Sequence, residues 1–427
     1  FQLVQKAADT GLGLLRIFLL WPWIEEQPGH WDFQVFDDTF DAAEKYGLRI
    51  KATLTANSGP WHIGTPSLLH SHTGFLDREQ EPAARQYVTQ CVQRYRNHPA
   101  LGQWLLWNEP VAGQDRTEET LELWRAFLKG KYHDDLRALN HRWRTGYASF
   151  NEIPFAEHTT HPLHAENHWR SYRPYLDDRT FCSQWLLIQL ERIKQWVREQ
   201  DPVTEICVNP STLLENLAAE GLDLEAMGRL VDIIGASYHP AWGFTYANRS
   251  LFPALMAVGI RKQAAYPSVR RVEITEVQSG NTLNSSNRPC AVDPSELARF
   301  YISGLFAGAE SVTGWLFNVR SYDFEAGDWG LLDDSDRPSV RSRMMRKIHD
   351  CLKQILAKTG GWKPVDPVAW IGVNQGAQAL ETQDCRCAEV PGRTVNDGAR
   401  GAALLNALLL EEGISSSIQQ LDYLPAD

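Results

Sequence analysis

Short apolar runs alternate with amphipathic stretches of helical period from the start of the chain to about residue 360. Seven of the apolar runs are predicted to be strands: Leu14–Leu20, Leu48–Leu54, Leu101–Trp107, Thr204–Val208, Val231–Tyr238, Val269–Thr275 and Ser311–Phe317. The segments between them favour helices, as at Phe36–Tyr46, Pro82–Tyr95, Glu118–Tyr132 and Arg179–Gln200. This alternation predicts an α/β fold in which helices cover a parallel sheet.

The number of strands suggests how the sheet closes. A (β/α)8 TIM barrel needs eight strands, whereas the pattern supplies seven, and the helix predicted at Phe1–Thr10 has no strand before it. The simplest account places the first strand upstream of Phe1. Without it, two hydrophobic sheet edges would be exposed. We therefore expect residues 1–362 to form a (β/α)8 barrel whose first strand is absent from this sequence.

The pattern changes after Trp362. A linker with two prolines, Lys363–Pro367, leads to a predicted strand at Val368–Val373, a helix at Asn396–Gly413 and a strand at Ser416–Leu421. So short a segment cannot close a core of its own. Residues 363–427 are expected to begin a second, truncated α/β domain.

Composition narrows the class of partner. The 427 residues carry a net charge of −11, which argues against nucleic acid, because phosphate binding needs a basic face. No apolar run reaches the roughly 18 residues of a membrane span. The 16 Trp residues favour flat platforms that stack on sugar rings or bases. The compartment stays open, with the cytoplasm preferred to secretion.

Metal and cofactor signals are weak. The seven Cys are scattered, and Cys385 and Cys387 form the only close pair. Four His residues, namely His158, His161, His164 and His168, lie in a Pro-interrupted loop with spacings that match no common ligand set. We expect no disulfide framework, no metal site and no cofactor.

The first candidate catalytic group is Glu109, in the segment Trp107-Asn108-Glu109-Pro110 directly after a predicted strand. A carboxylate at the end of a barrel strand lies on the catalytic face. Asn108 could bind a substrate hydroxyl while Glu109 faces the scissile oxygen. Glu109 could act as a general acid if an apolar pocket or a nearby carboxylate raises its pKa. The alternative is a structural Glu paired with a basic residue.

The second candidate is Glu276, at the end of Arg271–Glu276. Strand alternation places Val272, Ile274 and Glu276 on one face and Glu273 on the other, where we expect it to pair with an Arg or Lys of a helix. Retaining glycosidases hold an acid/base and a nucleophile about 5–5.5 Å apart. Opposite sides of a barrel mouth can supply that separation for Glu109 and Glu276.

With these residues in place, the chain resembles the clan A glycosidases, whose acid/base Glu follows Asn after strand four and whose nucleophile follows strand seven. Within the clan it is most similar to glycoside hydrolase family 42, mostly β-galactosidases. The matching segments are Trp21–Glu25 with Gly29–Phe33, Tyr95–Pro99, Phe127–Tyr132 with Leu139–Gly146, and Thr275–Ser279. The resemblance covers roughly residues 1–362. It implies a retaining mechanism, an amidotransferase-like domain beginning in the tail, and a homo-oligomer, which in this family is a trimer.

Two departures from the family pattern concern the sugar. The family's Arg-Arg-His stretch is replaced by Leu76–Pro82, and its Glu-x-x-His becomes Glu325-Ala326-Gly327-Asp328. The resemblance implies a sugar contact for Glu325, whereas the missing groups leave galactose open. A terminal β-galactoside is expected, with an arabinoside, fucoside or mannoside as alternatives. A catalytically retired carbohydrate-binding protein is a third hypothesis, against which both glutamates argue.

Further side chains are candidates for the pocket. Tyr238 ends a strand and could hydrogen-bond the nucleophile, keeping it ionised, or lie in the core. Trp315 could form the floor under the sugar, or fill the barrel. Asn209, Trp61 and Trp21 follow three other strands and are predicted rim contacts.

Overall fold

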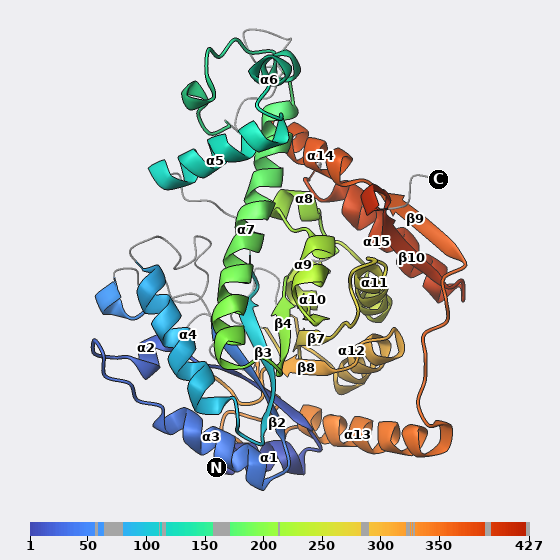
Figure 1. Ribbon diagram of the computed structural model, residues 1–427. Coiled ribbons are helices and arrows are strands. Elements are labelled where there is room, and N and C mark those ends of the chain that lie inside the picture. Colours follow the sequence, from blue (N-terminus) through green and yellow to red (C-terminus); the bar gives the residue numbers. More distant parts are fainter. Residues whose placement is uncertain are drawn as a thin grey trace.

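The computed structural model is an α/β barrel with helices outside the strands (Figure 1). It describes residues 1–55, 59–63, 80–110, 112, 117–156, 171–211, 214–282, 290–321, 325, 327, 329–388 and 394–423, without the side chains of 55, 241–242 and 383–388. The barrel strands are β1 (Leu14–Phe18), β2 (Arg49–Thr55), β3 (Leu101–Asn108), β4 (Glu205–Asn209), β5 (Ile233–Ile234), β6 (Ser237–Tyr238), β7 (Ile274–Gln278) and β8 (Val312–Trp315).

All the barrel strands pair in parallel, in the order β1-β2-β3-β4-β5 and β6-β7-β8. A parallel bridge between Ile234 and Val272 joins the two sheets, so β5 and β6 are two halves of the strand predicted at Val231–Tyr238. The seven predicted strands and the (β/α)8 fold class are therefore confirmed.

The two outer strands differ from the central ones. Every residue of β1 and of β8 is half-buried, whereas β3 is buried at every position except Gly102. The rings of Phe18 and Trp315 meet edge to face at 5.5 Å, which brings the ends of β1 and β8 together. An additional strand upstream of Phe1 stays a prediction.

Helices surround these strands, apart from α5 and α6, which lie outside the barrel. The helices before the tail are α1 (Gln2–Asp9), α2 (Trp21–Ile24), α3 (Gln34–Lys45), α4 (Glu81–Tyr95), α5 (Glu118–Lys131), α6 (Leu136–Trp143), α7 (Arg173–Gln200), α8 (Leu217–Glu220), α9 (Leu224–Leu230), α10 (Pro240–Gly243), α11 (Phe252–Ala264), α12 (Pro294–Phe306) and α13 (Val340–Thr359). A capping box between Asp293 and Glu296 fixes the start of α12. Within the described residues, no helix is long and apolar enough to cross a membrane.

A small lobe projects beyond the barrel, formed by α5, α6 and the first part of α7 (Figure 1). Its own apolar cluster is built around Trp124 and Trp143. Asp177 of α7 is fully buried there and accepts hydrogen bonds from Tyr132 Oη at 2.6 Å and Trp143 Nε1 at 2.8 Å. The buried charge is thus paired, and it ties α7 to the lobe.

The tail packs on the barrel. It contains β9 (Ala369–Val373), α14 (Gln375–Ala388), α15 (Asp397–Glu411) and β10 (Ser416–Gln420), and β9 pairs with β10 in parallel. Both strands and α15 match the predicted elements, whereas α14 was not predicted. Arg261 of α11 donates to the carbonyl of Ser416 at 2.9 Å, and Asn216 donates to the carbonyl of Gln378 at 2.7 Å. These contacts hold the tail against the outer helices.

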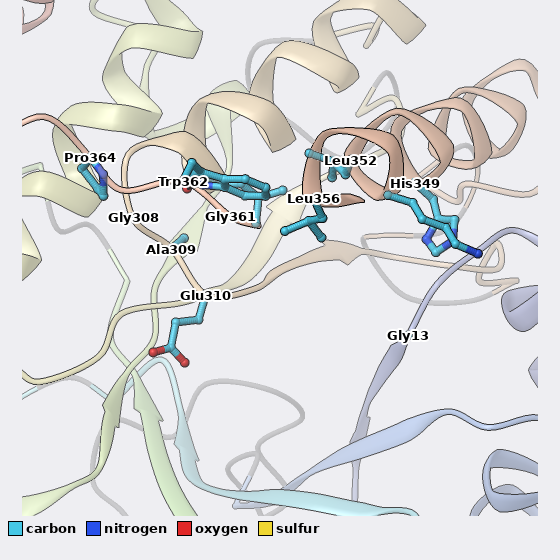
Figure 2. Close-up of a pocket in the computed structure, with 12 residues that line it drawn as sticks. Gly13, Gly308, Ala309, Glu310, His349, Leu352, Leu356, Gly361, Trp362 and Pro364 are labelled. Carbon is cyan, nitrogen blue, oxygen red and sulfur yellow. Dashed lines mark hydrogen bonds between the residues drawn. The ribbon is translucent and has the colours of Figure 1, made fainter. Parts of the chain in front are cut away.

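An open groove of about 790 Å³ lies at the other end of the barrel from the strand-end glutamates. Gly13 and Glu310, which precede β1 and β8, lie on one side of it, and Leu352 and Leu356 of α13 lie on the other (Figure 2). Because Glu109 follows β3 and Glu276 lies in the second half of β7, this groove, which is lined on one side by residues that precede strands, is not where they meet.

Candidate active site

The backbone at Glu109 is held in an unusual conformation. Its φ is +46°, in the left-handed region that side chains other than Gly rarely adopt. Its N–H donates to both the carbonyl and the Oδ1 of Asn209, at 3.1 and 3.3 Å. The partner on β4 therefore fixes a strained turn directly after β3. Strain of this kind is common at functional sites.

Glu276 lies on a bulge in β7. The N–H groups of Thr275 and Glu276 both donate to the carbonyl of Ala236, at 2.9 and 3.1 Å, and the strand register shifts between Ile274 and Val277. Two consecutive residues thus oppose one residue of the neighbouring strand, which interrupts the alternation of side chains. The bulge turns Glu276 toward the barrel axis.

The same bulge overturns the expectation for Glu273. Glu273 is buried inside the barrel, where it pairs with Lys51 of β2 and accepts from Gln103 Nε2 of β3 at 3.0 Å. Its predicted partner was an Arg or Lys of a helix, and that prediction is wrong. The strict period of two, on which it relied, does not hold across the bulge.

Arg16 connects the two candidate segments. From β1 it donates to Glu276 Oε1 at 2.5 Å, to Asn108 Oδ1 at 2.6 Å and to Thr53 Oγ1 at 3.0 Å. Sequence reasoning missed this residue. The signal was present, because Arg16 is the one charged residue in the apolar run Leu14–Leu20, and a charge buried in a barrel strand needs a partner.

His239, not Tyr238, contacts Glu276. His239 Nε2 lies 3.2 Å from Glu276 Oε2. Tyr238 faces outward to α11, where its hydroxyl accepts from Gln263 Nε2 at 3.4 Å and packs so closely that a Cβ on Gly259 would lie 2.2 Å away. Of the two alternatives for Tyr238, a hydrogen bond to the nucleophile or a place in the core, the structure shows the second. Side chains alternate along β6, so the next residue faces the site.

The carboxyl groups of Glu109 and Glu276 are close enough to act together. Their oxygens and a ring nitrogen of His239 all lie within 4.8 Å of one another. Retaining glycosidases place the two carboxyls about 5–5.5 Å apart, and inverting ones about 6.5–9.5 Å. The approach of one oxygen of each carboxyl to within 4.8 Å is compatible with the spacing of a retaining enzyme.

The surroundings push the two pKa values in opposite directions. Burial, and then the neighbouring charge of Glu276, raise the pKa of Glu109 to about 7. Burial would also raise the pKa of Glu276, but Arg16 and His239 more than offset it and hold the pKa of Glu276 below its ordinary value. A proton donor beside an ionised carboxylate is the pair that acid-assisted displacement requires.

A metal is the other chemistry that these groups could support. Glu109, His239 and Glu276 offer ligand atoms at suitable spacing, as do Asp41, Glu44 and His98 on the surface. Arg16 already occupies one oxygen of Glu276 with a positive charge. That contact disfavours a dication and favours acid–base chemistry.

Trp315 and Glu325 lie together beside the pair. Trp315 Nε1 donates to Glu325 Oε2 at 3.1 Å, and Arg320 donates to the same oxygen at 3.0 Å. Glu325 is buried, and burial raises its pKa even though Arg320 and His239 oppose the change. The half-buried ring of Trp315 and the carboxyl of Glu325 are thus placed to meet a ligand above the strands.

The remaining predicted contacts divide into buried and exposed residues. Asn209 is fully buried and donates to Asn108 Oδ1 at 3.3 Å and Ser237 Oγ at 3.1 Å, so it supports the site from beneath. Trp21 is only 3% exposed and stacks on Tyr87 at 4.9 Å, which makes it packing for the loop after β1. The rim contacts predicted for these two residues are not formed. Trp61 alone of the three is exposed, at 70%.

Several sequence features lie outside the described residues. These are the positions 76–79 that replace the Arg-Arg-His stretch, Asp328, and the four His residues between 158 and 168.

Comparisons with known proteins agree with this geometry. The curated relatives include the β-galactosidases GalA of Bacillus licheniformis and GanA of Bacillus subtilis, each 25% identical over 267 and 266 residues respectively, or 56% of this chain. The chain spans 37% of the length of these relatives.

Solved structures share the fold. The β-galactosidase of Rahnella sp. R3 superposes with a TM-score of 0.81 at 16% identity, over 98% of this chain and 62% of that one. The β-galactosidase of Marinomonas ef1 gives 0.79 at 17% identity, over 98% and 67%. The family model described as beta-galactosidase, glycoside hydrolase family 42, matches residues 5–355. This chain belongs to glycoside hydrolase family 42.

Proposed function

We propose that the protein is a retaining exo-β-glycosidase, β-galactosidase-like, that removes terminal sugars by double displacement. The observation that carries the proposal is the pair Glu109 and Glu276, with oxygens within 4.8 Å and pKa values moved in opposite directions. Burial alone would move both pKa values upward, so the split comes from the specific contacts of Arg16 and His239.

The first step forms a covalent intermediate. Glu276 attacks the anomeric carbon as a carboxylate, the glycosidic bond breaks, and Glu109 gives its proton to the leaving oxygen. Arg16 and His239 keep Glu276 ionised until it attacks. The products of this step are a glycosyl ester on Glu276, the free leaving group, and an ionised Glu109.

The second step reverses these roles. Once Glu276 is an ester its negative charge is gone, so the charge that raised the pKa of Glu109 is removed. Glu109 then takes a proton from water while that water attacks the anomeric carbon and Glu276 leaves as a carboxylate. The pair returns to its starting protonation state, and no cofactor is required.

The sugar contacts are part of the proposal. Asn108 would bind the hydroxyl beside the anomeric carbon, and Trp315 would form the floor of the pocket. Glu325 would accept a hydrogen bond from a sugar hydroxyl. A β-galactoside is the first candidate, since the curated relatives are named β-galactosidases. An arabinoside, fucoside or mannoside is the alternative, because the Arg-Arg-His stretch of the family is replaced by Leu76–Pro82.

The test is covalent labelling with 2-fluoro glycosides of each sugar, followed by peptide mass spectrometry. The proposal expects a label on Glu276 from one sugar, and turnover of the matching aryl glycoside. Labelling at another residue would refute the catalytic assignment. Binding of the sugar without labelling or turnover would instead indicate a carbohydrate-binding protein.

We also infer the organisation of the chain. Residues 1–362 form the catalytic barrel, and residues 363–427 begin an amidotransferase-like domain. A homo-oligomer, a trimer by family resemblance, and the absence of a nucleic-acid partner belong to the same proposal. Sedimentation velocity at several protein concentrations tests the oligomer, and a monomer at all of them would exclude it.

A further inference from the structure

Two tryptophans at the mouth of the barrel are exposed to an extent unusual for their size. Trp61 is 70% exposed and Trp23 is 54% exposed. Burying a large apolar side chain stabilises a protein by about 1.5–3 kcal/mol. Two indoles that stay exposed do not contribute this stabilisation. Exposed aromatic surface of this kind at the mouth of a barrel is a candidate binding surface.

The two residues lie at the same end of the barrel as the catalytic pair. Trp23 belongs to α2, directly after β1, and Trp61 begins the 3-10 turn η1 (Trp61–Ile63) after β2. These strands pair in parallel with each other, and β2 pairs in parallel with β3. Since Glu109 follows β3, both tryptophans extend from the same mouth.

Contacts between the two loops hold the indole of Trp61 in place. Trp61 Nε1 donates to the carbonyl of Glu26 at 3.1 Å, which links η1 to the segment after Trp23. His62 Nε2 lies 3.8 Å from Glu25 Oε1, and the His62 ring stands perpendicular to the Trp61 ring at 5.7 Å. The polar edge of Trp61 is thus satisfied within the protein, and its aromatic surface is left for a ligand.

The position of the platform indicates which part of a substrate it meets. The catalytic pocket is lined by buried groups such as Glu276, Asn108 and Glu325, which suit a single terminal sugar. An exo-acting enzyme takes only that one sugar before the scissile bond. Any further sugar of the substrate therefore lies on the leaving-group side, outside the buried pocket.

We propose that Trp23 and Trp61 form a stacking platform for the leaving-group sugar of a di- or oligosaccharide. The apolar C–H face of a pyranose would lie on the indoles, which supply contact area with little loss of conformational freedom. The net charge of −11 disfavours the other common partner of exposed aromatics, a nucleic-acid base. The inference rests on the proposed glycosidase function and specifies its substrate as a saccharide rather than a simple glycoside.

The experiment compares two substrates that differ only in the leaving group. Lactose carries a second sugar, whereas β-galactosyl fluoride has a leaving group with no ring. If another sugar is selected by the labelling test, its matching pair is used. Trp23→Ala and Trp61→Ala are expected to lower kcat/KM for lactose about 10-fold or more and for the fluoride less than 2-fold. Trp370→Ala, at a tail tryptophan that is 50% exposed, serves as the matched control and should change neither.

A binding measurement separates this inference from the proposed function. Calorimetric titration of lactose into Glu276→Gln protein, with and without Trp61→Ala, needs no turnover. Weaker binding in the double variant supports the platform even where activity is absent. Equal loss on lactose and fluoride, or unchanged lactose binding and turnover in the tryptophan variants, overturns it. Failure of the wild-type protein to cleave the fluoride counts against the glycosidase proposal alone.

Discussion

The carboxyl groups that follow β3 and lie on β7 differ in their electrostatic surroundings. Glu276 has a guanidinium on one oxygen and an imidazole near the other. The N–H of Glu109 is fixed by Asn209, and for its carboxyl the effects of burial and of the Glu276 charge outweigh those of Ser237, His239 and Arg16. The difference teaches that the placement of cations, more than burial, divides the roles. Removing a carboxyl group or one of the cations around it tests this difference.

The largest effect is expected from removing each carboxyl. Glu276→Ala should lower kcat at least about 10⁴-fold for every substrate, because no nucleophile remains. Glu109→Ala should lower it about 10²–10⁴-fold for substrates with poor leaving groups and much less for those with good ones. Rates on aryl glycosides of graded leaving-group pKa check this. Equal losses in both variants across the series would contradict the assigned roles.

Azide offers an internal control for these two variants. In Glu109→Ala, azide should restore turnover of activated substrates, and the product should be a glycosyl azide with retained anomeric configuration. In Glu276→Ala, azide should also restore turnover, but the glycosyl azide should have inverted anomeric configuration. Product configuration determined by NMR distinguishes these outcomes, and a reversed pattern would exchange the two roles.

A smaller loss is expected when the cations around Glu276 are removed. Arg16→Gln should lower kcat/KM about 10²-fold and move its acidic limb to higher pH by about one unit or more, because the pKa of Glu276 rises. Arg16→Lys should keep the pH profile close to that of the wild type, because the positive charge is retained. Its kcat/KM should still be reduced, because a lysine cannot contact Glu276 and Asn108 at once as the guanidinium does. A reduced rate with an unchanged profile would show that Arg16 is only structural.

His239 and Tyr238 give a matched pair for the same test. His239→Gln removes the second cation beside Glu276, so it should lower kcat/KM and raise the acidic limb in the same direction as Arg16→Gln. Tyr238→Phe removes a hydroxyl that faces α11, and it should leave kcat/KM within about 3-fold. Steady-state pH profiles of both variants decide the matter. A pH shift in Tyr238→Phe alone would restore the original prediction for Tyr238.

Glu109 must be protonated in the first step and ionised in the second, so kcat/KM and kcat should fall on opposite sides of the pH profile. In kcat/KM, activity should fall above about pH 7 as Glu109 loses the proton it must donate. When hydrolysis of the intermediate is rate-limiting, kcat should instead fall on the acidic side, because Glu109 must then be ionised. Pre-steady-state kinetics with a fast-leaving aryl glycoside separates the steps. Limbs of the same direction in both would contradict a shared acid/base.

Sequence reasoning found the strands and both glutamates because each leaves a local signal. Apolar runs of strand length identify the barrel, and a Glu directly after such a run identifies its mouth. The residues that sequence reasoning misplaced depend on the exact register of the strands. The bulge at Thr275 and Glu276 reverses which residues share a face with Glu273, and the exact end of β6 decides whether Tyr238 or His239 faces inward. Contacts of Arg16 join residues about 260 positions apart, which no local pattern contains.

The smallest expected effect concerns stability, and it measures the cost of ionising Glu109 in its buried position beside Glu276. The pKa of Glu109 is raised in the folded protein from 4.5 to about 7, so the unfolded chain ionises first as pH rises. The stability that the neutral carboxyl contributes is full below about pH 4.5 and is lost as pH rises through about 7. Glu109→Gln cannot ionise and should therefore be more stable than the wild type at pH 8, by about 1 kcal/mol, and no more stable at pH 4.5. Chemical denaturation at both pH values measures the difference. The same gain at both pH values would mean that packing, and not the ionisation of Glu109, distinguishes the variant.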